Sequence, residues 1–162
     1  MKILCLNPPF KTEYGRFSRT SRSPAITKSG TIYYPIWLCY AAGVLEDAGY
    51  EVKVIDSCAY GYDLEATLRI VAEFKPEMVV IDTSTPSVYS DVKACDGVKG
   101  IRPECFVVLM GTHPTALPEE TLQLSDSIDA IAVGEADYTL KELSQKLSLA
   151  KPNLRERGDI HN

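Results

Sequence analysis

The sequence predicts an α/β fold in which helices cover both faces of a five-stranded parallel sheet. Short apolar segments alternate with segments of helical periodicity along the 162 residues, and the helical segments are long enough to be the crossovers between parallel strands. Residues 78–81 are apolar at every position, which is typical of a strand covered on both faces. These observations favour a doubly wound architecture.

Five strands are expected, at residues 2–7, 51–56, 78–81, 105–110 and 130–133. Residues 51–56 alternate in polarity, whereas 78–81 and 105–110 are almost continuously apolar. Because crossovers between parallel strands are right-handed, few strand orders remain. The flavodoxin-like order 2-1-3-4-5 fits best.

Helices are expected at residues 36–48, 63–74, 88 to about 100, 119–123 and from Asp137 onwards. The first has one apolar face and stops at Gly49. Pro76 ends the second, Pro118 suits the first turn of the fourth, and Asp137 is suited to cap the last.

Composition excludes several classes of protein. Apolar residues make up 45% and charged residues 24% of the chain, and the net charge is −5, which disfavours nucleic acid as a partner. No apolar run is long enough for a membrane span, and no signal-peptide pattern precedes the first strand. The five cysteines are irregularly spaced, so we expect reduced thiols, no metal site built from this chain alone, and a cytoplasmic protein.

Two segments fall outside the alternation. Residues 11–34 carry five basic residues and one acidic residue and form an unusually long connection, which is either functional or a mobile loop. Residues 148–162 are polar and contain Pro152 and Gly158. We therefore expect one domain at residues 1–147 and a linker at residues 148–162.

Ligands of such folds bind beyond the carboxyl ends of the strands. The loops that follow the first, third, fourth and fifth strands are rich in small and hydroxyl residues, which let a ligand approach the backbone and form hydrogen bonds. The candidate site residues in these loops are Asn7, Pro8, Pro9, Thr83, Ser84, Thr85, Gly111, Thr112, His113, Gly134, Glu135 and Ala136. Replacing Gly111 or Gly134 with Leu is expected to fill the cleft and leave the fold intact.

Several candidates also have a purely structural interpretation. Gly111 and Gly134 could be turn glycines, and His113 could be a surface or capping residue instead of a ligand contact. Trp37 is expected in the core. Glu135 is the carboxylate of most interest, because it directly follows a strand.

Familiar ligand classes of this architecture lack their motifs. The first strand is followed by Asn7-Pro8-Pro9 instead of G-x-G-x-x-G, and two prolines are poor donors for a phosphate loop. A phosphoacceptor role for Asp82 would need an acidic pair after the first strand and a lysine after the fifth, and both are missing.

The segments 3–10, 34–52, 111–120 and 133–140 resemble the N-terminal cobalamin-binding domain of cobalamin-dependent radical S-adenosylmethionine enzymes. The resemblance covers nearly the whole chain. Thr112 and Ala136 stand where this family usually has glycine. Cobalamin domains of the mutase type carry a cobalt-ligating histidine after the first strand, whereas no histidine precedes His113 here, so cobalamin is expected without a histidine from the protein as its lower ligand.

The resemblance implies that the nucleotide tail of cobalamin lies against the third, fourth and fifth strand ends. The segment 7–10 and the basic stretch beyond it would then face the lower side of the corrin. The radical half of such enzymes needs C-x-x-x-C-x-x-C, which this chain lacks. The resemblance therefore implies a downstream radical domain that holds a 4Fe-4S cluster and S-adenosylmethionine and acts on a small molecule.

The chain alone is then not expected to be catalytic. The whole protein would carry out methyl transfer or a tetrapyrrole-type oxidative cyclisation. The alternative is a stand-alone flavodoxin-like regulatory or interaction domain that binds no corrinoid.

Overall fold

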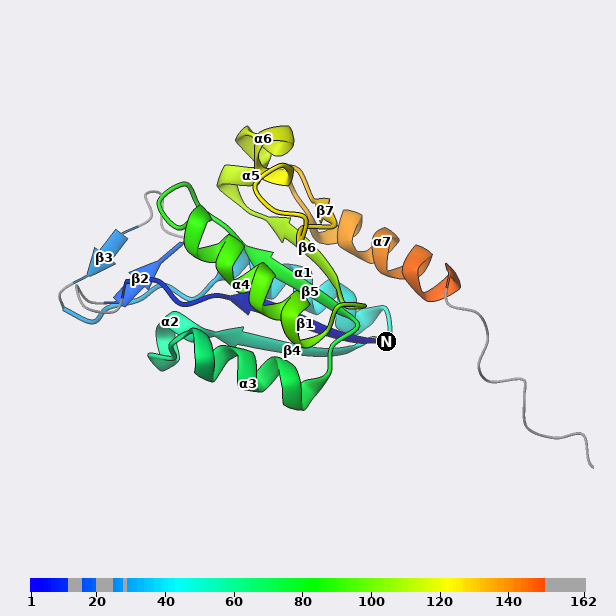
Figure 1. Ribbon diagram of the computed structural model, residues 1–162, viewed down its shortest axis with the longest axis horizontal. Coiled ribbons are helices and arrows are strands. Elements are labelled where there is room, and N and C mark those ends of the chain that lie inside the picture. The colour runs from blue at the N-terminus through cyan, green and yellow to red at the C-terminus, as the bar shows by residue number, and fades with distance from the viewer. Residues whose placement is uncertain (12–15, 20–24, 28, 151–162) are drawn as a thin grey trace, which may run out of the picture.

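The central feature of the protein is a parallel sheet with helices on both faces (Figure 1). The computed structural model describes residues 1–11, 16–19, 25–27 and 29–150. Its five-stranded sheet has the order β4-β1-β5-β6-β7, which confirms the predicted order 2-1-3-4-5. The strands are β1 (Lys2–Asn7), β4 (Glu51–Asp56), β5 (Met78–Asp82), β6 (Phe106–Met110) and β7 (Ala130–Ile131).

Alternate residues of each strand enter two separate cores. Leu4 and Leu6 of β1 face a core that includes Val79, Ile81 and Leu109. Ile3 and Cys5, one position out of step, face a second core with Val80 and Met110. The period of two along a strand places successive side chains on opposite faces, so the continuous apolar pattern of β5 follows from burial on both sides.

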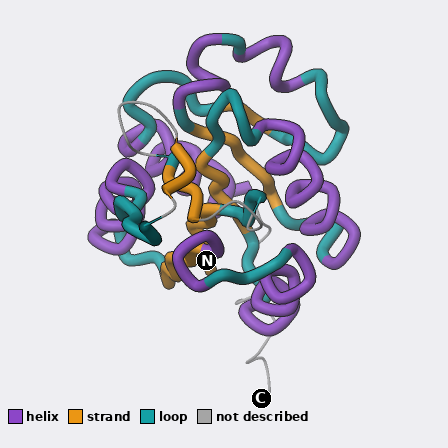
Figure 2. The backbone as a smooth tube through the Cα atoms, turned by 90° about the vertical axis from the view of Figure 1, so that its left-hand side faces the viewer, coloured by secondary structure: helices purple, strands orange, loops and turns teal. Residues whose placement is uncertain are grey.

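Two pairs of helices cover these cores. Helices α3 (Leu64–Phe74) and α4 (Val88–Ile101) pack together on one face, while α1 (Ile36–Asp47) and α7 (Asp137–Ala150) pack together on the other. Figure 2 shows the strands enclosed between the helical layers. The doubly wound α/β architecture is therefore confirmed, with helix bounds close to those expected.

The prediction missed two short helices and made the last strand too long. Helices α2 (Ser57–Tyr60) and α5 (Thr112–Ala116) occupy segments read as loops, and α6 (Pro118–Leu122) starts one residue before its predicted range. The final strand β7 has two residues instead of four. Helix α7 extends three residues into the predicted linker, and the rest of that linker, residues 151–162, lies outside the described residues.

The basic connection contains a small antiparallel sheet of β2 (Arg16–Ser18) and β3 (Ala25–Thr27). It rests on a third apolar cluster of Phe10, Phe17 and Cys58, against which Ile26 packs. The Phe10 and Phe17 rings lie 4.5 Å apart between centroids. The sequence lacks a strand signal here because each strand has only three residues.

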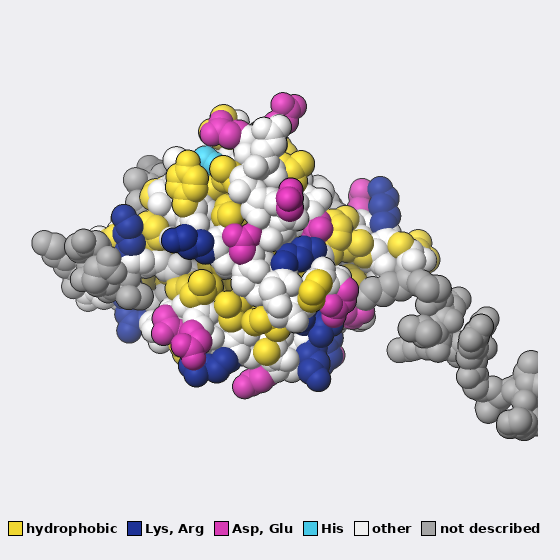
Figure 3. Space-filling model, viewed as in Figure 1, with side chains coloured by type: hydrophobic (Ala, Val, Ile, Leu, Met, Phe, Trp, Pro, Cys, Tyr) yellow, Lys and Arg dark blue, Asp and Glu magenta, His cyan; other side chains and the backbone are white. Residues whose placement is uncertain are grey.

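The surface is mixed in charge. Basic and acidic side chains are interspersed on the face shown in Figure 3. Among the described helices, none has both the length and the apolar character needed to cross a membrane. All five cysteines are free thiols, and four of them are buried.

The layered core predicts a clear contrast between two leucines. Leu109 lies fully buried in β6, whereas the side chain of Leu149 on α7 is 85% exposed. Leu109→Ala should lower the free energy of unfolding by about 2–5 kcal/mol because it leaves a cavity. Leu149→Ala should change it by no more than about 0.5 kcal/mol. Urea unfolding measures both, and equal losses would contradict this description of the core.

Candidate functional site

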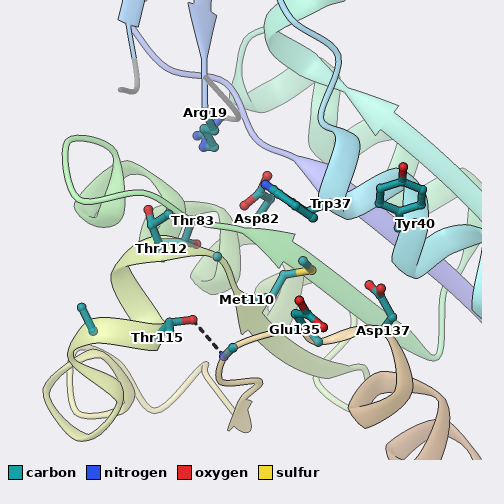
Figure 4. Close-up of a pocket in the computed structure, with 14 residues that line it drawn as sticks. Arg19, Trp37, Tyr40, Asp82, Thr83, Met110, Thr112, Thr115, Glu135 and Asp137 are labelled. Carbon is teal, nitrogen blue, oxygen red and sulfur yellow. Dashed lines mark hydrogen bonds between the residues drawn. The ribbon is translucent and has the colours of Figure 1, made fainter. Parts of the chain in front are cut away.

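A cavity of about 810 Å³ opens at the carboxyl edge of the sheet (Figure 4). Its walls come from the ends of β5 and β6, from α5, from the loop between β7 and α7, and from the first turns of α1. One further wall residue, Arg19, comes from the basic connection. The lining residues are Arg19, Trp37, Tyr40, Asp82, Thr83, Met110, Gly111, Thr112, Thr115, Ala116, Gly134, Glu135, Ala136 and Asp137.

Half of the predicted site residues line this cavity. The lining candidates all lie in the loops after the third, fourth and fifth strands of the main sheet. They are Thr83, Gly111, Thr112, Gly134, Glu135 and Ala136. The others are Asn7, Pro8, Pro9, Ser84, Thr85 and His113, and the structure places them outside the lining. The cavity lies at the carboxyl edge of the sheet, where these candidates were expected, and the loop after the first strand does not line it.

Arg19 is buried where three connections meet. Its side chain is 1% exposed and forms an ion pair with Asp91 of α4, with Nη2 at 2.5 Å from Oδ1. Its Nε donates to Ser87 Oγ at 3.2 Å and its Nη1 donates to the Pro8 carbonyl at 2.8 Å. Because Nη1 also donates to the side-chain oxygen of Asn7, the guanidinium joins the first strand end to the start of α4.

The segment after β1 therefore anchors Arg19. The Asn7 amide group donates to Asp56 Oδ1 at 2.8 Å while its oxygen accepts from Arg19. The Pro8 carbonyl accepts from both Arg19 and the Cys58 thiol. Asn7 and Pro8 are buried and Pro9 is half-buried. These residues affect the cavity through Arg19 and do not line it.

Asp82 and Thr83 bring two unpartnered polar atoms to the cavity wall. Asp82 is 4% exposed and Thr83 is fully buried, and neither Asp82 Oδ2 nor Thr83 Oγ1 has a hydrogen-bond partner. Burial raises the pKa of Asp82 to about 6, although the nearby charge of Arg19 opposes this shift. Buried polar atoms in native proteins usually have partners, so this pair fits a wall that binds a ligand.

Gly111 is required by the close approach of two strand ends. Its φ is +113°, and a Cβ atom there would lie 2.4 Å from the Thr83 carbonyl oxygen and 2.7 Å from Asp82 Oδ1. The expectation that Leu at Gly111 would leave the fold intact is therefore wrong. Gly134 also has a positive φ, +74°, but a Cβ there meets nothing within 4 Å, so that position can test the cavity.

His113, Ser84 and Thr85 lie outside the cavity lining, next to the residues that form it. His113 lies in α5, is 7% exposed, and its Nδ1 is 3.2 Å from Thr85 Oγ1. The interpretation as a surface histidine is therefore wrong. Ser84 is also buried, with its hydroxyl 2.9 Å from that of Ser87. The His113–Thr85 contact joins α5 to the loop after β5, and the Ser84–Ser87 contact lies within that loop.

An aromatic wall stands opposite, on α1 (Figure 4). Trp37 and Tyr40 are 54% and 55% exposed, and their ring centroids lie 6.2 Å apart. The expectation of a core Trp37 is wrong because this residue lies beside, and not on, the apolar face formed by Leu38, Ala41 and Leu45. A ring that lies off the buried stripe of an amphipathic helix is the signal that could have placed it at the surface.

Acidic residues line the third side of the cavity. Glu135 is exposed and Asp137 half-buried at the start of α7. Partial burial, together with the charge of Glu135, raises the pKa of Asp137. The Gly134 N–H donates to Thr115 Oγ1 at 3.0 Å, so this loop is fixed to α5.

Eight lining residues were not among the site residues predicted from the sequence. Asp82, Thr115 and Asp137 stand within the loops that were identified, so proximity to the selected residues could have found them. Met110 and Ala116 flank a selected segment. Arg19 lies in the connection after β1, and Trp37 and Tyr40 lie in α1. These three residues reach the cavity only because the folded chain returns to the carboxyl edge of the sheet.

A parallel α/β domain with a cavity at its carboxyl edge and unpartnered polar atoms in its wall belongs to the class of ligand-binding domains. Within that class, residues 22–144 match the B12 binding domain family. The chain belongs to this family.

Similar proteins include enzymes of two kinds. An uncharacterized methyltransferase of Pyrococcus horikoshii is 30% identical over 169 residues, which cover all of this chain and 34% of that protein. An anaerobic magnesium-protoporphyrin IX monomethyl ester cyclase of Rubrivivax gelatinosus is 28% identical over 110 residues, covering 67% of this chain and 20% of the cyclase.

A further similar protein is a cytidylyl-2-hydroxyethylphosphonate methyltransferase of Streptomyces wedmorensis. It is 28% identical over 127 residues, covering 65% of this chain and 23% of that enzyme. The chain thus spans 34% or less of the length of each of these three relatives.

The raised pKa of Asp82 predicts how its replacement affects stability. The folded protein holds this proton up to about pH 6 and the unfolded chain only to its ordinary pKa of 3.8, so the stabilisation by protonation is lost as pH rises through 6. Asp82→Asn should therefore stabilise the fold by roughly 1–2 kcal/mol more at pH 7.5 than at pH 5.

Urea unfolding at the two pH values measures this difference. Asp126→Asn, at an exposed position, controls for the loss of one carboxyl group from the chain. An equal effect of Asp82→Asn at both pH values would show that Asp82 is ionised throughout this range.

The two cavity glycines should differ in their tolerance of alanine. Gly111→Ala places a Cβ against the Thr83 backbone and should lower the free energy of unfolding by more than about 3 kcal/mol. Gly134→Ala adds only the strain of a positive φ, about 1 kcal/mol. Thermal and urea unfolding compare them, and equal losses would contradict the close contact at Gly111.

Proposed function

We propose that this B12-binding domain holds cobalamin in the cavity at its carboxyl edge and serves a larger radical S-adenosylmethionine enzyme. The observation that carries the proposal is the cavity itself, in which the buried Asp82 and Thr83 present polar atoms without partners. A corrinoid has both apolar surface and many hydrogen-bonding groups. The cavity offers both kinds of partner, so its residues fit the cofactor.

Several residues would hold the cofactor in this proposal. The aromatic wall of Trp37 and Tyr40 offers apolar surface for a flat ring, and Gly134 leaves open space at the loop before α7. Thr112 and Thr115 add hydroxyl groups from α5. Cobalamin, when bound, supplies a cobalt centre that carries methyl groups or electrons.

The protein offers no cobalt-ligating histidine at the cavity in this proposal. Only two histidines occur in the sequence. His113 is bonded to Thr85 and stands outside the cavity lining, and His161 lies outside the described residues. We therefore expect cobalamin to bind without a histidine from the domain as its lower ligand.

The wider assignment depends on the similar proteins. Methyltransferases and a cyclase, each much longer than this chain, contain the matching region. In our proposal a radical domain with a 4Fe-4S cluster and S-adenosylmethionine joins this one and performs methyl transfer or oxidative cyclisation on a small molecule. The five free thiols are compatible with a reducing compartment such as the cytoplasm.

Cobalamin binding tests the proposal. The purified chain is mixed with hydroxocobalamin and desalted, and corrin absorbance that co-elutes with the protein is measured along with a dissociation constant from equilibrium dialysis. The wild-type chain should retain the corrinoid. Gly134→Leu, which adds a side chain at the cavity, should weaken binding at least about 10-fold, since filling a pocket displaces the ligand.

Gly49→Leu is the matched control. Gly49 also has a positive φ, +88°, and open space around its Cβ direction, but it lies before β4 at the opposite edge of the sheet. Its backbone strain is therefore similar, and binding should be unchanged. Loss of binding in both variants would point to general destabilisation, and no retention by the wild type would favour a corrinoid-free regulatory or interaction domain.

A further inference from the structure

A buried acid in the cavity wall has an oxygen atom without a partner. Asp82 lines the cavity and is 4% exposed, and its Oδ2 atom has no hydrogen bond. A buried charge without a partner costs free energy, whereas the protonated acid carries no charge and avoids most of this cost. The ionisation of Asp82 is therefore sensitive to what fills the cavity.

The guanidinium that lines the cavity with Asp82 is bonded to other groups. Arg19 pairs with Asp91 of α4 through Nη2, and its Nε donates to Ser87. Its Nη1 donates to the Asn7 side chain and to the carbonyl of the next residue. The Arg19 charge favours the ionised form of Asp82, but the charge of Asp91 opposes this effect.

The other charged groups around this carboxyl group, in the part of the chain that the structure describes, are acids. Asp91 of α4 and Asp56 at the end of β4 both raise its pKa. Glu135 and Asp137 line the same cavity from the start of α7 and the loop before it. The described lining residues from α1 and α5 carry no charge, and His113 of α5 lies outside the lining.

A ligand in the cavity would displace the solvent that faces Asp82. Burial already raises the pKa of Asp82 to about 6, and filling the cavity of about 810 Å³ extends that burial. The side-chain carboxamides of a corrinoid are uncharged, and the nucleotide phosphate of cobalamin is anionic. Both the loss of solvent and the added negative charge disfavour the carboxylate.

We infer that ligand binding in this cavity is coupled to the uptake of one proton by Asp82, a regulation of the site by pH that rests on the proposed function. The proton comes from solvent and bonds to the Asp82 carboxylate as the cavity fills. Because such coupling is reciprocal, the proton favours the ligand as much as the ligand favours the proton. The domain therefore binds its ligand more tightly at acidic pH than at alkaline pH.

The dissociation constant for hydroxocobalamin at pH 6 and pH 8 tests this coupling. Uptake of one proton weakens binding by up to about 10-fold for each pH unit above the pKa of the free acid. Since that pKa is about 6, the affinity of the wild type should fall at least about 10-fold between the two pH values. Calorimetry near pH 7, in two buffers of different ionisation enthalpy, should show uptake of about one proton per ligand.

Asp82→Asn is the decisive variant, because asparagine has the shape of the protonated acid and does not titrate. Its affinity should be the same at pH 6 and pH 8. The ratio of the wild-type and variant dissociation constants also cancels any titration of the ligand itself. Asp126→Asn, at an exposed position, removes one acid elsewhere and should keep the pH dependence of the wild type.

The carboxyl carbon signal of Asp82 in NMR spectra gives a measure that does not depend on affinity. In the ligand-free chain it should titrate near pH 6, and with hydroxocobalamin bound its midpoint should rise by at least about one pH unit. The same midpoint in both states would overturn the inference.

Two further outcomes separate this inference from the proposed function. If Glu135→Gln combined with Asp137→Asn abolishes the pH dependence and Asp82→Asn does not, the proton belongs to those acids and the inference is wrong. If the wild type binds hydroxocobalamin equally well at pH 6 and pH 8, the inference is wrong and the proposed function stands. If the wild type binds no corrinoid at either pH, both fail.

Discussion

The ion pair between Arg19 and Asp91 holds the carboxyl edge of this domain together. Both side chains are almost completely buried, and their closest atoms are 2.5 Å apart. Removing one partner of such a pair leaves an unpaired charge in the interior, which typically costs about 3–5 kcal/mol. Arg19 therefore cannot leave the sheet edge without a large loss of stability, and the part of the cavity wall that it forms is fixed to α4.

The same ion pair explains the shape of the cavity. Arg19 reaches back to the Pro8 carbonyl after β1 and across to Ser87 before α4, so it occupies the region next to the point where the strand order reverses. Ligands of doubly wound sheets usually bind at that point. Here the open space is shifted toward the ends of β5, β6 and the loop before α7.

The sheet and its large helices could be predicted because their signals are local and repeated. Strand β5 is apolar throughout, and α1 has a regular buried stripe. Helix α5 escaped prediction because its five residues include Pro114 and carry no apolar periodicity. The cavity was located only in part, because the long-range contacts of Arg19 have no counterpart in local sequence patterns.

The cavity wall formed by residues 134–137 follows a strand that is only weakly paired with the sheet. Strand β7 pairs with β6 through only two residues, Ala130 and Ile131, and the Gly134–Thr115 hydrogen bond then joins the next loop to α5. A segment with so few ladder hydrogen bonds opens at a lower free energy than the central strands do. Any molecule that spans the cavity from β5 to this loop would slow that opening, so amide hydrogen exchange in residues 130–137 reports occupancy of the site from a distance.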